Sequence, residues 1–267
     1  MLKGLEGRRA LVTGASGGIG RAIAVDLHAR GAHVIVSGRR AEVLDSLAAG
    51  LGGRCEVVRA DLADRRDTEA LAEVAAGVDV LIANAGLPGT GRLEEYSDEQ
   101  LDRVLDVNLR APIVLARSAA PPMALRGEGA IVFMGSASGK TTTGNQSLYC
   151  GTKFGLRGFA LSLREDMHGS GVGVTHVAPG PILEAGMFAD TGLGVPRGSG
   201  ARTPRHVTAA VARAIERAPA EIDVASVQLR LIGRVFLTAP GLFNALGRHM
   251  GATRIAADFA DRQSAKR

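Results

Sequence analysis

The chain contains no tryptophan, and aromatic residues make up only 3% of its 267 residues. A tryptophan platform for stacking bases or sugar rings is therefore excluded. The two cysteines, Cys55 and Cys150, do not suggest a disulfide framework or a metal site. The six histidines are dispersed and lack the spacing of metal ligands. We therefore expect neither a metal site nor stabilisation by disulfides.

The sequence also lacks a long uninterrupted apolar run and a run of charge of one sign. A membrane-crossing helix needs about 20 apolar residues in succession, and no such stretch occurs. The first residues, MLKGLEGRRALV, have no long apolar segment of the kind that a signal peptide carries, so we expect a cytoplasmic protein. The net charge of +5 is modest and the arginines are scattered, which argues against nucleic acid as a partner.

Apolar residues are abundant, at 46%, and they fall into short runs that alternate with helical patterns. This alternation predicts an α/β fold, a single doubly wound parallel sheet with helices on both faces. In such a sheet, ligands bind at the carboxyl ends of the strands. Strands are predicted at 9–13, 33–36, 55–61, 78–84, 130–136, 172–179 and 222–225. Helices are predicted at 21–31, 41–50, 67–76, 98–125, 154–167 and 204–218, with Pro121 and Pro122 at or beyond the end of the fourth.

Glycines stand between the first predicted strand and the first predicted helix, at Gly14, Gly18 and Gly20. Glycine permits a tight turn and a close approach of the backbone to a diphosphate, and the helix N-terminus adds free N–H groups and a positive dipole end. The spacing Gly-x-x-x-Gly-x-Gly, with Ser16 and Ile19 between the glycines, favours a nucleotide site over a glycine-rich turn without a ligand.

A Tyr-x-x-x-Lys pair, Tyr149 and Lys153, stands thirteen residues after Ser136. Residues four apart share one face of a helix, so the hydroxyl and the ammonium group can point at the same spot. A nearby ammonium favours the phenolate and is expected to lower the pKa of the tyrosine towards neutral pH. The pair is thus interpreted as a proton-transfer site; the alternative is a half-buried tyrosine and a solvated lysine.

Several segments together resemble the short-chain dehydrogenase/reductase family, in its compact single-domain branch. They are TGASGGIG at 13–20, NAG at 84–86, Asn108 within VNL, Ser136, and YCGTK at 149–153. They occur in the family's order and spacing, and the resemblance covers residues 5 to 225. It implies a Rossmann-type fold and reversible hydride transfer between a nicotinamide cofactor and a carbonyl or secondary alcohol.

The resemblance also implies roles for individual residues. Tyr149 would act as general acid and base, Ser136 would hydrogen bond to the substrate oxygen, and Lys153 would bond the nicotinamide ribose and lower the pKa of Tyr149. Asn108 would position a water in a proton relay, whereas taken alone it would be interpreted as a polar helix residue bonded to backbone. Glu184 stands where the family often has a threonine that bonds the carboxamide. Further cofactor contacts are implied at Asp61, Leu62, Asn84, Ala85, Gly86, Pro179, Gly180 and the backbone of Ile182.

The end of the second predicted strand indicates which nicotinamide cofactor is preferred. NAD sites of this fold generally carry an acidic residue there, which bonds the ribose hydroxyls. Here Ser37 and Gly38 are followed by Arg39 and Arg40. Arg39 can pair with a 2′-phosphate, and no carboxylate stands there to repel it. We therefore expect NADP(H) in preference to NAD(H); the alternative is that both arginines are solvated at a helix start.

Residues 1–225 are expected to form one dinucleotide-binding catalytic domain, in which the glycine-rich loop 184–203 covers the substrate, as the resemblance implies. Residues 226–267 depart from the family's common short ending. Their apolar residues need burial, and we expect them to pack on the same domain or at a subunit interface of a homodimer or homotetramer, in preference to a membrane surface. Interruptions of this apolar segment stand at Arg230, Arg234, Pro240 and Gly241.

The sequence does not identify the substrate, a small-molecule carbonyl or alcohol. Six apolar residues indicate an apolar pocket: Met187, Phe188, Leu193, Val195, Phe236 and Phe243. The alternative is that they serve simple packing, as such residues more often do. Two other functions stay open. One is a non-catalytic NADP-binding sensor or scaffold with the same fold. The other is a sugar-nucleotide epimerase of the family's extended branch, for which the chain looks too short.

Overall fold

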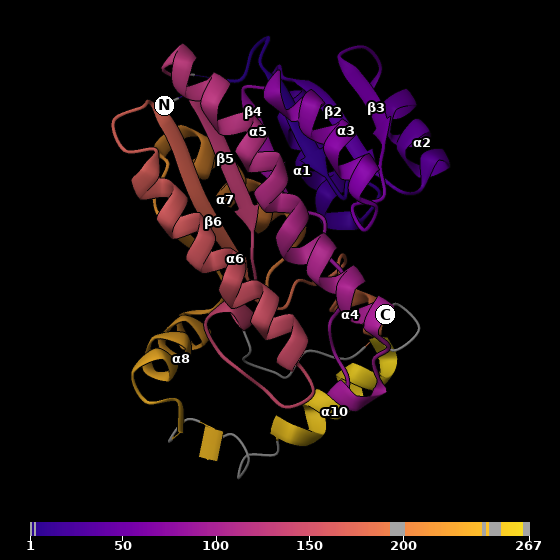
Figure 1. Cartoon of the computed structure of the whole chain (residues 1–267), viewed down its shortest axis with the longest axis vertical. Coiled ribbons are helices and arrows are strands. Elements are labelled where there is room, and N and C mark those ends of the chain that lie inside the picture. Colours follow the sequence, from indigo (N-terminus) through magenta and orange to yellow (C-terminus); the bar gives the residue numbers. More distant parts are fainter. Residues whose placement is uncertain (1, 3, 193–200, 242–243, 246–251, 264–267) are drawn as a thin grey trace.

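The computed structural model describes residues 2, 4–192, 201–241, 244–245 and 252–263. At its centre lies one seven-stranded sheet with the strand order β3-β2-β1-β4-β5-β6-β7 (Figure 1). Each neighbouring pair is parallel, so the predicted α/β fold with a doubly wound sheet is confirmed. The strands are β1 (Arg9–Thr13), β2 (His33–Gly38), β3 (Cys55–Arg59), β4 (Val80–Ala83), β5 (Gly129–Met134), β6 (Val172–Pro179) and β7 (Glu221–Val224).

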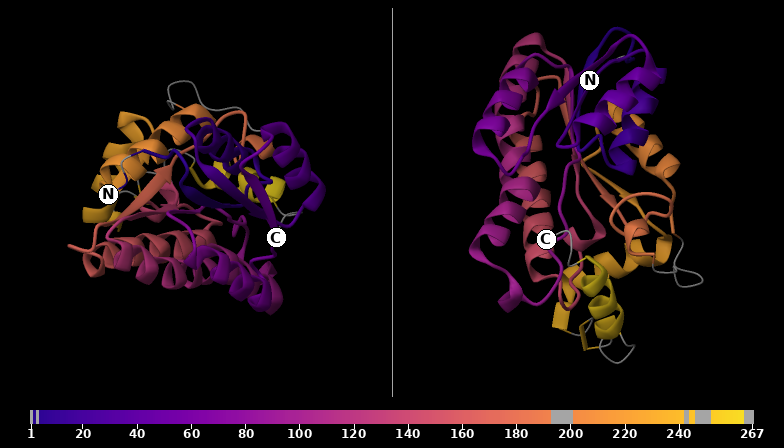
Figure 2. Two further views of the ribbon diagram at one scale, coloured as in Figure 1. Left: turned by 90° about the horizontal axis from the view of Figure 1, so that it is seen from above. Right: turned by 90° about the vertical axis from the view of Figure 1, so that its right-hand side faces the viewer.

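Helices cover both faces of the sheet, which lies between them as a middle layer (Figure 2). One core cluster contains side chains of α1 (Gly18–Ala29), α2 (Ala41–Leu51) and α7 (Pro204–Arg217). The other contains side chains of α3 (Arg65–Ala76), α5 (Ala111–Arg126) and α6 (Ser147–Asp166). Neighbouring residues of a strand contribute to opposite clusters, as Leu11 and Val12 of β1 do. The central strands are thus buried on both faces, which fixes the positions of their carboxyl ends.

The helix predicted at 98–125 is present over 98–126 and contains one π-helical turn. It consists of α4 (Asp98–Leu105), a π-helical turn (Asp106–Arg110) and α5, which follow one another without a break. The placement of Pro121 and Pro122 at or beyond its end was wrong, because both lie inside α5. Each proline removes one helical hydrogen bond, but the buried side chains around them keep the helix against the core. These side chains belong to Ala119, Ala120 and Met123.

The helix ends instead at Gly127, which has the left-handed φ of 73° that glycine adopts without strain. The predicted start of α7 is confirmed: Pro204 is its first residue, and Thr203 precedes it. In the described residues, no helix is both long and apolar enough to span a bilayer.

The C-terminal extension lies at the carboxyl ends of the strands (Figure 1). It contains α8 (Val227–Thr238) and α10 (Ala252–Gln263). From α10, Arg262 donates a hydrogen bond to the carbonyl oxygen of Thr191 at 2.9 Å, and Gln263 donates one to that of Met187 at 2.6 Å. The extension is therefore bonded to the first part of the loop 184–203; residues 193–200 of that loop lie outside the described residues.

Candidate active site

A cleft of about 1210 Å³ opens at the carboxyl ends of the central strands. Every residue that the sequence analysis assigned to catalysis or cofactor binding lines it, except Asn108. The chain thus brings together side chains from segments that are distant in the sequence. Those in the cleft are Gly14, Ser16, Gly18, Ile19, Gly20, Arg39, Arg40, Asp61, Leu62, Asn84, Ala85, Gly86, Ser136, Tyr149, Lys153, Pro179, Gly180 and Ile182.

The glycine-rich turn is closely packed. Gly14 has a φ of +67°, and a Cβ atom there would lie 2.8 Å from Cα of Ala85. A Cβ atom on Gly20 would lie 2.3 Å from the carbonyl oxygen of Gly14. Helix α1 begins at Gly18, and its N-cap residue Gly17 provides no side-chain hydrogen bond to the first helical N–H groups. These N–H groups therefore stay available to an anion in the cleft, which fits a diphosphate.

Thr13 locks this turn to the end of β4. Its hydroxyl oxygen accepts the backbone N–H groups of Asn84 and Ala85, each at 3.0 Å. In return, the side-chain amide of Asn84 donates to the carbonyl oxygen of Thr13 at 2.9 Å. Asn84 is thus bonded to backbone and shapes the wall of the cleft. Thr13 was not predicted to be a site residue, because a threonine at the end of a strand gives no local signal of such a role.

The end of β2 supplies two arginines to the cleft. Arg40 donates a hydrogen bond to the carbonyl oxygen of Ser16 in the glycine-rich turn. Arg39 is half-exposed and lies 4.0 Å from a carboxylate oxygen of Asp61. Asp61 has a closer partner in Arg103 of α4, at 3.2 Å. Arg103 also lines the cleft and was missed, since nothing in the local sequence of α4 connects it with the end of β3. Arg39 therefore lines the cleft and has a more distant carboxylate partner in Asp61 than Arg103 has.

Ser136, Tyr149 and Lys153 meet where β5 ends and α6 begins. Ser136 precedes the short 3₁₀ turn Ala137–Gly139, and its hydroxyl oxygen accepts the N–H of Ser138 at 3.1 Å. Lys153 is 3% exposed, its Nζ lies 5.7 Å from the centre of the Tyr149 ring, and it donates a hydrogen bond to the carbonyl oxygen of Met134 at 3.1 Å. The two side chains share one face of α6, as their spacing predicts.

The expected direction of the Tyr149 pKa was wrong for this structure. Burial raises the pKa of Tyr149 to about 12, and this effect outweighs a hydrogen bond with Ser136, which acts in the opposite direction. Burial also lowers the pKa of Lys153 to about 8, because the charged ammonium is removed from water. Desolvation therefore dominates the pKa of both groups.

Asn108 lies beside the cleft, fully buried, in the π-helical turn. Its side-chain oxygen accepts the N–H of Leu87 at 2.7 Å, and its amide donates to the Leu87 carbonyl at 2.9 Å and to the Thr152 hydroxyl at 3.3 Å. A Cβ atom on Gly86 would lie 3.5 Å from Oδ1 of Asn108 and 3.6 Å from Nζ of Lys153. Asn108 thus holds the backbone next to Lys153, and its side chain is bonded to that backbone.

Apolar side chains also line the cleft. Of the six residues expected to form an apolar pocket, Met187 and Phe188 line it. Phe236 is buried but lies outside the lining, so the alternative of simple packing applies to it. Leu193, Val195 and Phe243 lie outside the described residues. Two further lining residues come from the C-terminal extension: Leu229 of α8 and Phe259 of α10. The extension shows no local signal that could have identified them.

Phe259 stacks on Phe188, with ring centroids 6.2 Å apart and an interplanar angle of 22°.

Glu184 is exposed, has a φ of +68° and does not line the cleft. At the carboxyl end of β6, Ile182 forms a parallel bridge with Arg202, and the N–H of Leu183 donates to the Arg202 carbonyl at 2.7 Å. The backbone from Pro179 to Ile182 is thereby fixed along the cleft. In the described part of the chain, no cluster of three histidine, cysteine or carboxylate side chains is placed to hold a metal.

Comparison with known proteins agrees with this geometry. A family model described as short chain dehydrogenase matches residues 8–193. The chain is 44% identical to nodulation protein G of Rhizobium sp. over 185 residues, which are 68% of this chain and 76% of that protein. It is 38% identical to 3-oxoacyl-[acyl-carrier-protein] reductase FabG of Rickettsia conorii over 178 residues, 67% of this chain and 74% of that protein.

A solved structure of a short-chain dehydrogenase from Sphingobium yanoikuyae in complex with NADPH is also similar. It superposes with a TM-score of 0.77 at 26% identity, over 88% of this chain and 94% of that chain. The family match extends over more than half of the sequence, and it contains the glycine-rich turn, Ser136, Tyr149 and Lys153. The chain therefore belongs to the short-chain dehydrogenase family of oxidoreductases.

Proposed function

We propose that this protein is an NADP(H)-dependent oxidoreductase that interconverts a carbonyl and a secondary alcohol by hydride transfer. The observation that carries the proposal is that Ser136, Tyr149 and Lys153 line the same cleft as the glycine-rich turn Gly14–Gly20. A proton-transfer group and a diphosphate cradle in one cleft are what a nicotinamide-dependent reaction requires.

The residues of the cleft fit NADP(H). The open N-terminus of α1 would hold the diphosphate, and Arg39 would pair with the 2′-phosphate. The wall formed by Asp61 and Asn84 would hold the adenosine half, and the backbone at Pro179–Ile182 would hold the nicotinamide. When bound, the nicotinamide supplies or accepts the hydride. Support comes from the Sphingobium yanoikuyae structure, which holds NADPH, and from the half-exposed Arg39 at the end of β2.

Tyr149 is proposed as the general acid in reduction and the general base in oxidation. Because burial raises its pKa to about 12, the phenol keeps its proton at neutral pH and can donate it to a carbonyl oxygen. The Ser136 hydroxyl would hydrogen bond to the same oxygen. Lys153, with a pKa of about 8, would hold or release a proton near neutral pH beside the tyrosine. Asn108 would position a water in a proton relay behind Lys153, next to the Leu87 backbone that its side chain holds.

An apolar carbonyl compound is the proposed substrate class. Met187, Phe188 and Phe259 line the cleft together with the cofactor-binding residues. Stacked aromatic rings offer apolar area and no hydrogen bond to a hydroxylated ligand. The relative from Rickettsia conorii is named as a 3-oxoacyl reductase, which is consistent with a carbonyl on an acyl chain.

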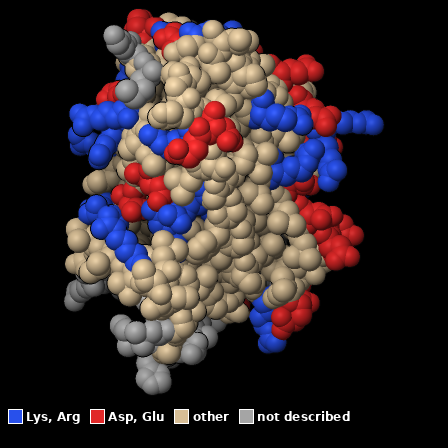
Figure 3. Space-filling view, turned by 60° about the vertical axis from the view of Figure 1, so that its left-hand side comes forward, with Lys and Arg blue, Asp and Glu red and all other residues tan. Residues whose placement is uncertain are grey.

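A cytoplasmic homodimer or homotetramer is the proposed state of the protein. Helix α8 exposes Val227, Leu231 and Val235, at 65%, 60% and 46%, a large apolar face for a protein in water. A second copy of the chain would cover it. On the face shown in Figure 3, acidic and basic side chains are interspersed, so this face has no large patch of one charge. Light scattering should give the mass of a dimer or tetramer, whereas sedimentation of the protein with anionic liposomes would favour a membrane surface.

The function is tested by two measurements on the purified protein. Fluorescence titration with NADPH and NADH measures cofactor binding. Loss of NADPH absorbance in the presence of keto-lipids, steroids and aliphatic ketones measures turnover. Binding with turnover supports the proposal. Tight NADPH binding without oxidation by any ketone of the panel, or without reduction of NADP⁺ by the matching alcohols, would instead favour the sensor or scaffold.

A further inference from the structure

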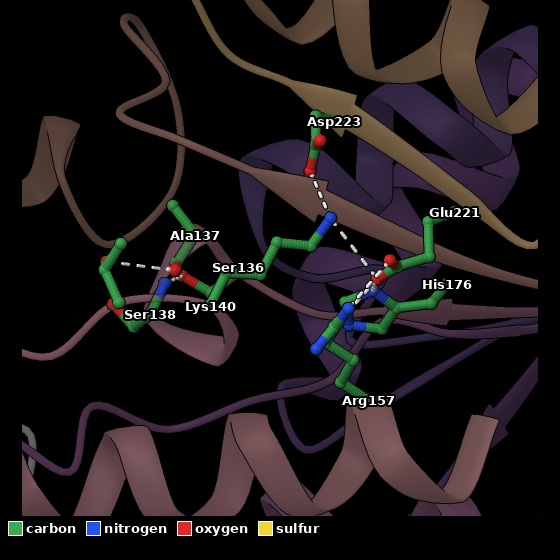
Figure 4. A network of polar contacts seen from close by, with 9 residues as sticks. Ser136, Ala137, Ser138, Lys140, Arg157, His176, Glu221 and Asp223 are labelled. Atoms are coloured by element: carbon green, nitrogen blue, oxygen red, sulfur yellow. Dashed lines mark hydrogen bonds and ion pairs between the residues drawn. The ribbon is translucent and has the colours of Figure 1, made fainter. Parts of the chain in front are cut away.

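A network of charged side chains lies behind the segment that carries Ser136, and no step proposed above uses it (Figure 4). Its centre is Glu221 of β7. The two carboxylate oxygens of Glu221 accept hydrogen bonds from Arg157 at 2.7 and 3.0 Å. Lys140 lies 3.3 Å from the same carboxylate and donates a hydrogen bond to Asp223 at 2.7 Å. One carboxylate therefore joins groups from several elements.

The two cations of this network come from the parts of the chain that hold the catalytic candidates. Lys140 directly follows the 3₁₀ turn Ala137–Gly139, which begins after Ser136. Arg157 stands one helical turn beyond Lys153 on α6, so the two share a face of that helix. Through these two ion pairs, Glu221 ties the Ser136 segment and helix α6 to the same strand.

The charges of the network balance and are largely withdrawn from water. The side chain of Lys140 is 13% exposed, and that of Glu221 is 23% exposed. Burial alone would raise the pKa of Glu221, but the contacts with His176 and Arg157 and the charge of Lys140 outweigh it, so the pKa lies below its ordinary value. Glu221 is thus ionised at neutral pH and keeps its partners in place.

His176 of β6 is the member of the network that lies beside Gly135, the residue before Ser136. It is fully buried, and its Nδ1 lies 3.2 Å from Glu221 Oε1, off the direction of an ideal hydrogen bond. The other edge of the ring faces Gly135, the residue before Ser136. A Cβ atom on Gly135 would lie 1.9 Å from Nε2 of His176, so the backbone of Gly135 rests directly on the imidazole. The N–H of Gly135 also donates to the Val177 carbonyl at 2.7 Å, which holds the strand end down on the ring.

We propose that His176, held in place by Glu221, is a positioning residue for Ser136. The imidazole edge is the surface on which Gly135 rests, and it thereby sets the distance between the Ser136 hydroxyl and Tyr149. His176 touches neither substrate nor cofactor and takes no part in proton transfer. The inference rests on the proposed function in that Ser136 and Tyr149 are taken as the pair that handles the substrate oxygen.

The test compares a variant that creates a steric clash between residue 135 and His176 with a double variant that removes the clash. In Gly135→Ala, the new methyl group meets the confined imidazole and displaces Ser136. A misplacement of about 1 Å can cost a factor of about 100 in rate, so we expect kcat for ketone reduction to fall by about that factor. In Gly135→Ala/His176→Ala, the ring is removed and space returns, so kcat should recover to within about tenfold of the native protein. The dissociation constant of NADPH should change by less than about threefold in both variants, because the α1 N-terminus is untouched.

Gly158→Ala is the matched control. It makes the same substitution on the outer part of α6, where a Cβ atom meets nothing within 4 Å. This variant should keep native kcat and KM. A native kcat for Gly135→Ala, or a double variant no faster than Gly135→Ala, would overturn the proposal, since removal of the ring would then bring no relief.

Two further measurements test the proposal if Gly135→Ala does not fold or if the native protein reduces no ketone. If Gly135→Ala does not fold, as judged by circular dichroism, His176→Ala alone should lower kcat by about tenfold with unchanged NADPH affinity, and native kcat would refute the role. Crystal structures of the native and variant proteins measure the separation of Ser136 Oγ and Tyr149 Oη. That separation should differ in Gly135→Ala and return in the double variant, even if the native protein reduces no ketone and the proposed function fails.

Discussion

The ammonium group of Lys153 donates a hydrogen bond to the carbonyl oxygen of Met134 at 3.1 Å. This bond ties helix α6 to the carboxyl end of strand β5, two residues before Ser136. It gives the buried ammonium one polar partner, and a neutral carbonyl offsets only part of the hydration that the charge loses. The pKa of Lys153 consequently falls to about 8.

Replacement of Lys153 by methionine should change how stability depends on pH. Unfolded Lys153 has a pKa of 10.5 and the folded residue one of about 8, so the unfolded chain binds more protons between these values. The contribution of Lys153 to stability therefore rises with pH through this window. Burial of the Lys153 amino group lowers the free energy of unfolding by about 3 kcal/mol at pH 7 and by about 1 kcal/mol at pH 10.

The free energy of unfolding, measured in urea, should thus favour Lys153→Met more at pH 7 than at pH 10, by about 2 kcal/mol. Both proteins are compared in a Tyr149→Phe background, because burial raises the pKa of Tyr149 to about 12 and its titration would overlap at high pH. An equal difference at the two pH values would show that Lys153 keeps its ordinary pKa.

Removal of the Tyr149 hydroxyl should abolish most of the turnover. Tyr149→Phe keeps the ring but lacks the proton donor, and general acid catalysis is worth a factor of about 10²–10⁴. We expect kcat to fall by that factor while the dissociation constant of NADPH changes little. Tyr96→Phe is the matched control: its hydroxyl donates to the Thr90 carbonyl, and Tyr96 does not line the cleft, so turnover should persist. Near-native kcat for Tyr149→Phe would exclude this acid.

Arg39 should determine the preference between the two nicotinamide cofactors. Arg39→Ala removes a half-exposed cation at the end of β2 and should weaken NADPH binding by about 1.5–3 kcal/mol, the scale of a hydrogen bond to a charged group. NADH, which has no 2′-phosphate, should bind almost as before. Titrations of Arg65→Ala, an exposed arginine on α3 outside the cleft, provide the control. Equal losses for both cofactors would mean that Arg39 has a structural role.

Phe259 should contribute to the binding of bulky substrates and have little effect on the binding of the cofactor. It stacks on Phe188, and both rings line the cleft, so Phe259→Ala should raise KM for large apolar ketones by about tenfold, or about 1.4 kcal/mol. Leu237→Ala, at an exposed position of α8 in the same extension, should leave KM unchanged. Truncation after residue 226 should reproduce the effect of Phe259→Ala on KM. Unchanged kinetics in both the variant and the truncated chain would place the substrate elsewhere.

Much of this protein could be predicted from spacing within single elements. The alternation of apolar runs and helical patterns predicted all seven strands of the sheet, and the signal is clearest for the central strands, which are buried on both faces and therefore largely apolar. The glycines at 14, 18 and 20 stand between a strand and a helix, where only a residue without a side chain fits the close contacts with Ala85 and Gly14. Tyr149 and Lys153 share a face because they are four residues apart on one helix.

Tertiary structure decided the properties that depend on contacts between distant segments. Pro121 and Pro122 lie within a helix because packing of their neighbours outweighs the hydrogen bonds that they remove. The direction of the Tyr149 pKa follows from burial, which the sequence does not encode locally. Phe259 reaches Phe188, and His176 supports Gly135, only through the arrangement of whole elements. The sequence by itself determined the family, the sheet and the catalytic candidates, since each rests on local spacing; the shape, polarity and alignment of the site depend on desolvation and close packing, which arise only when the elements assemble.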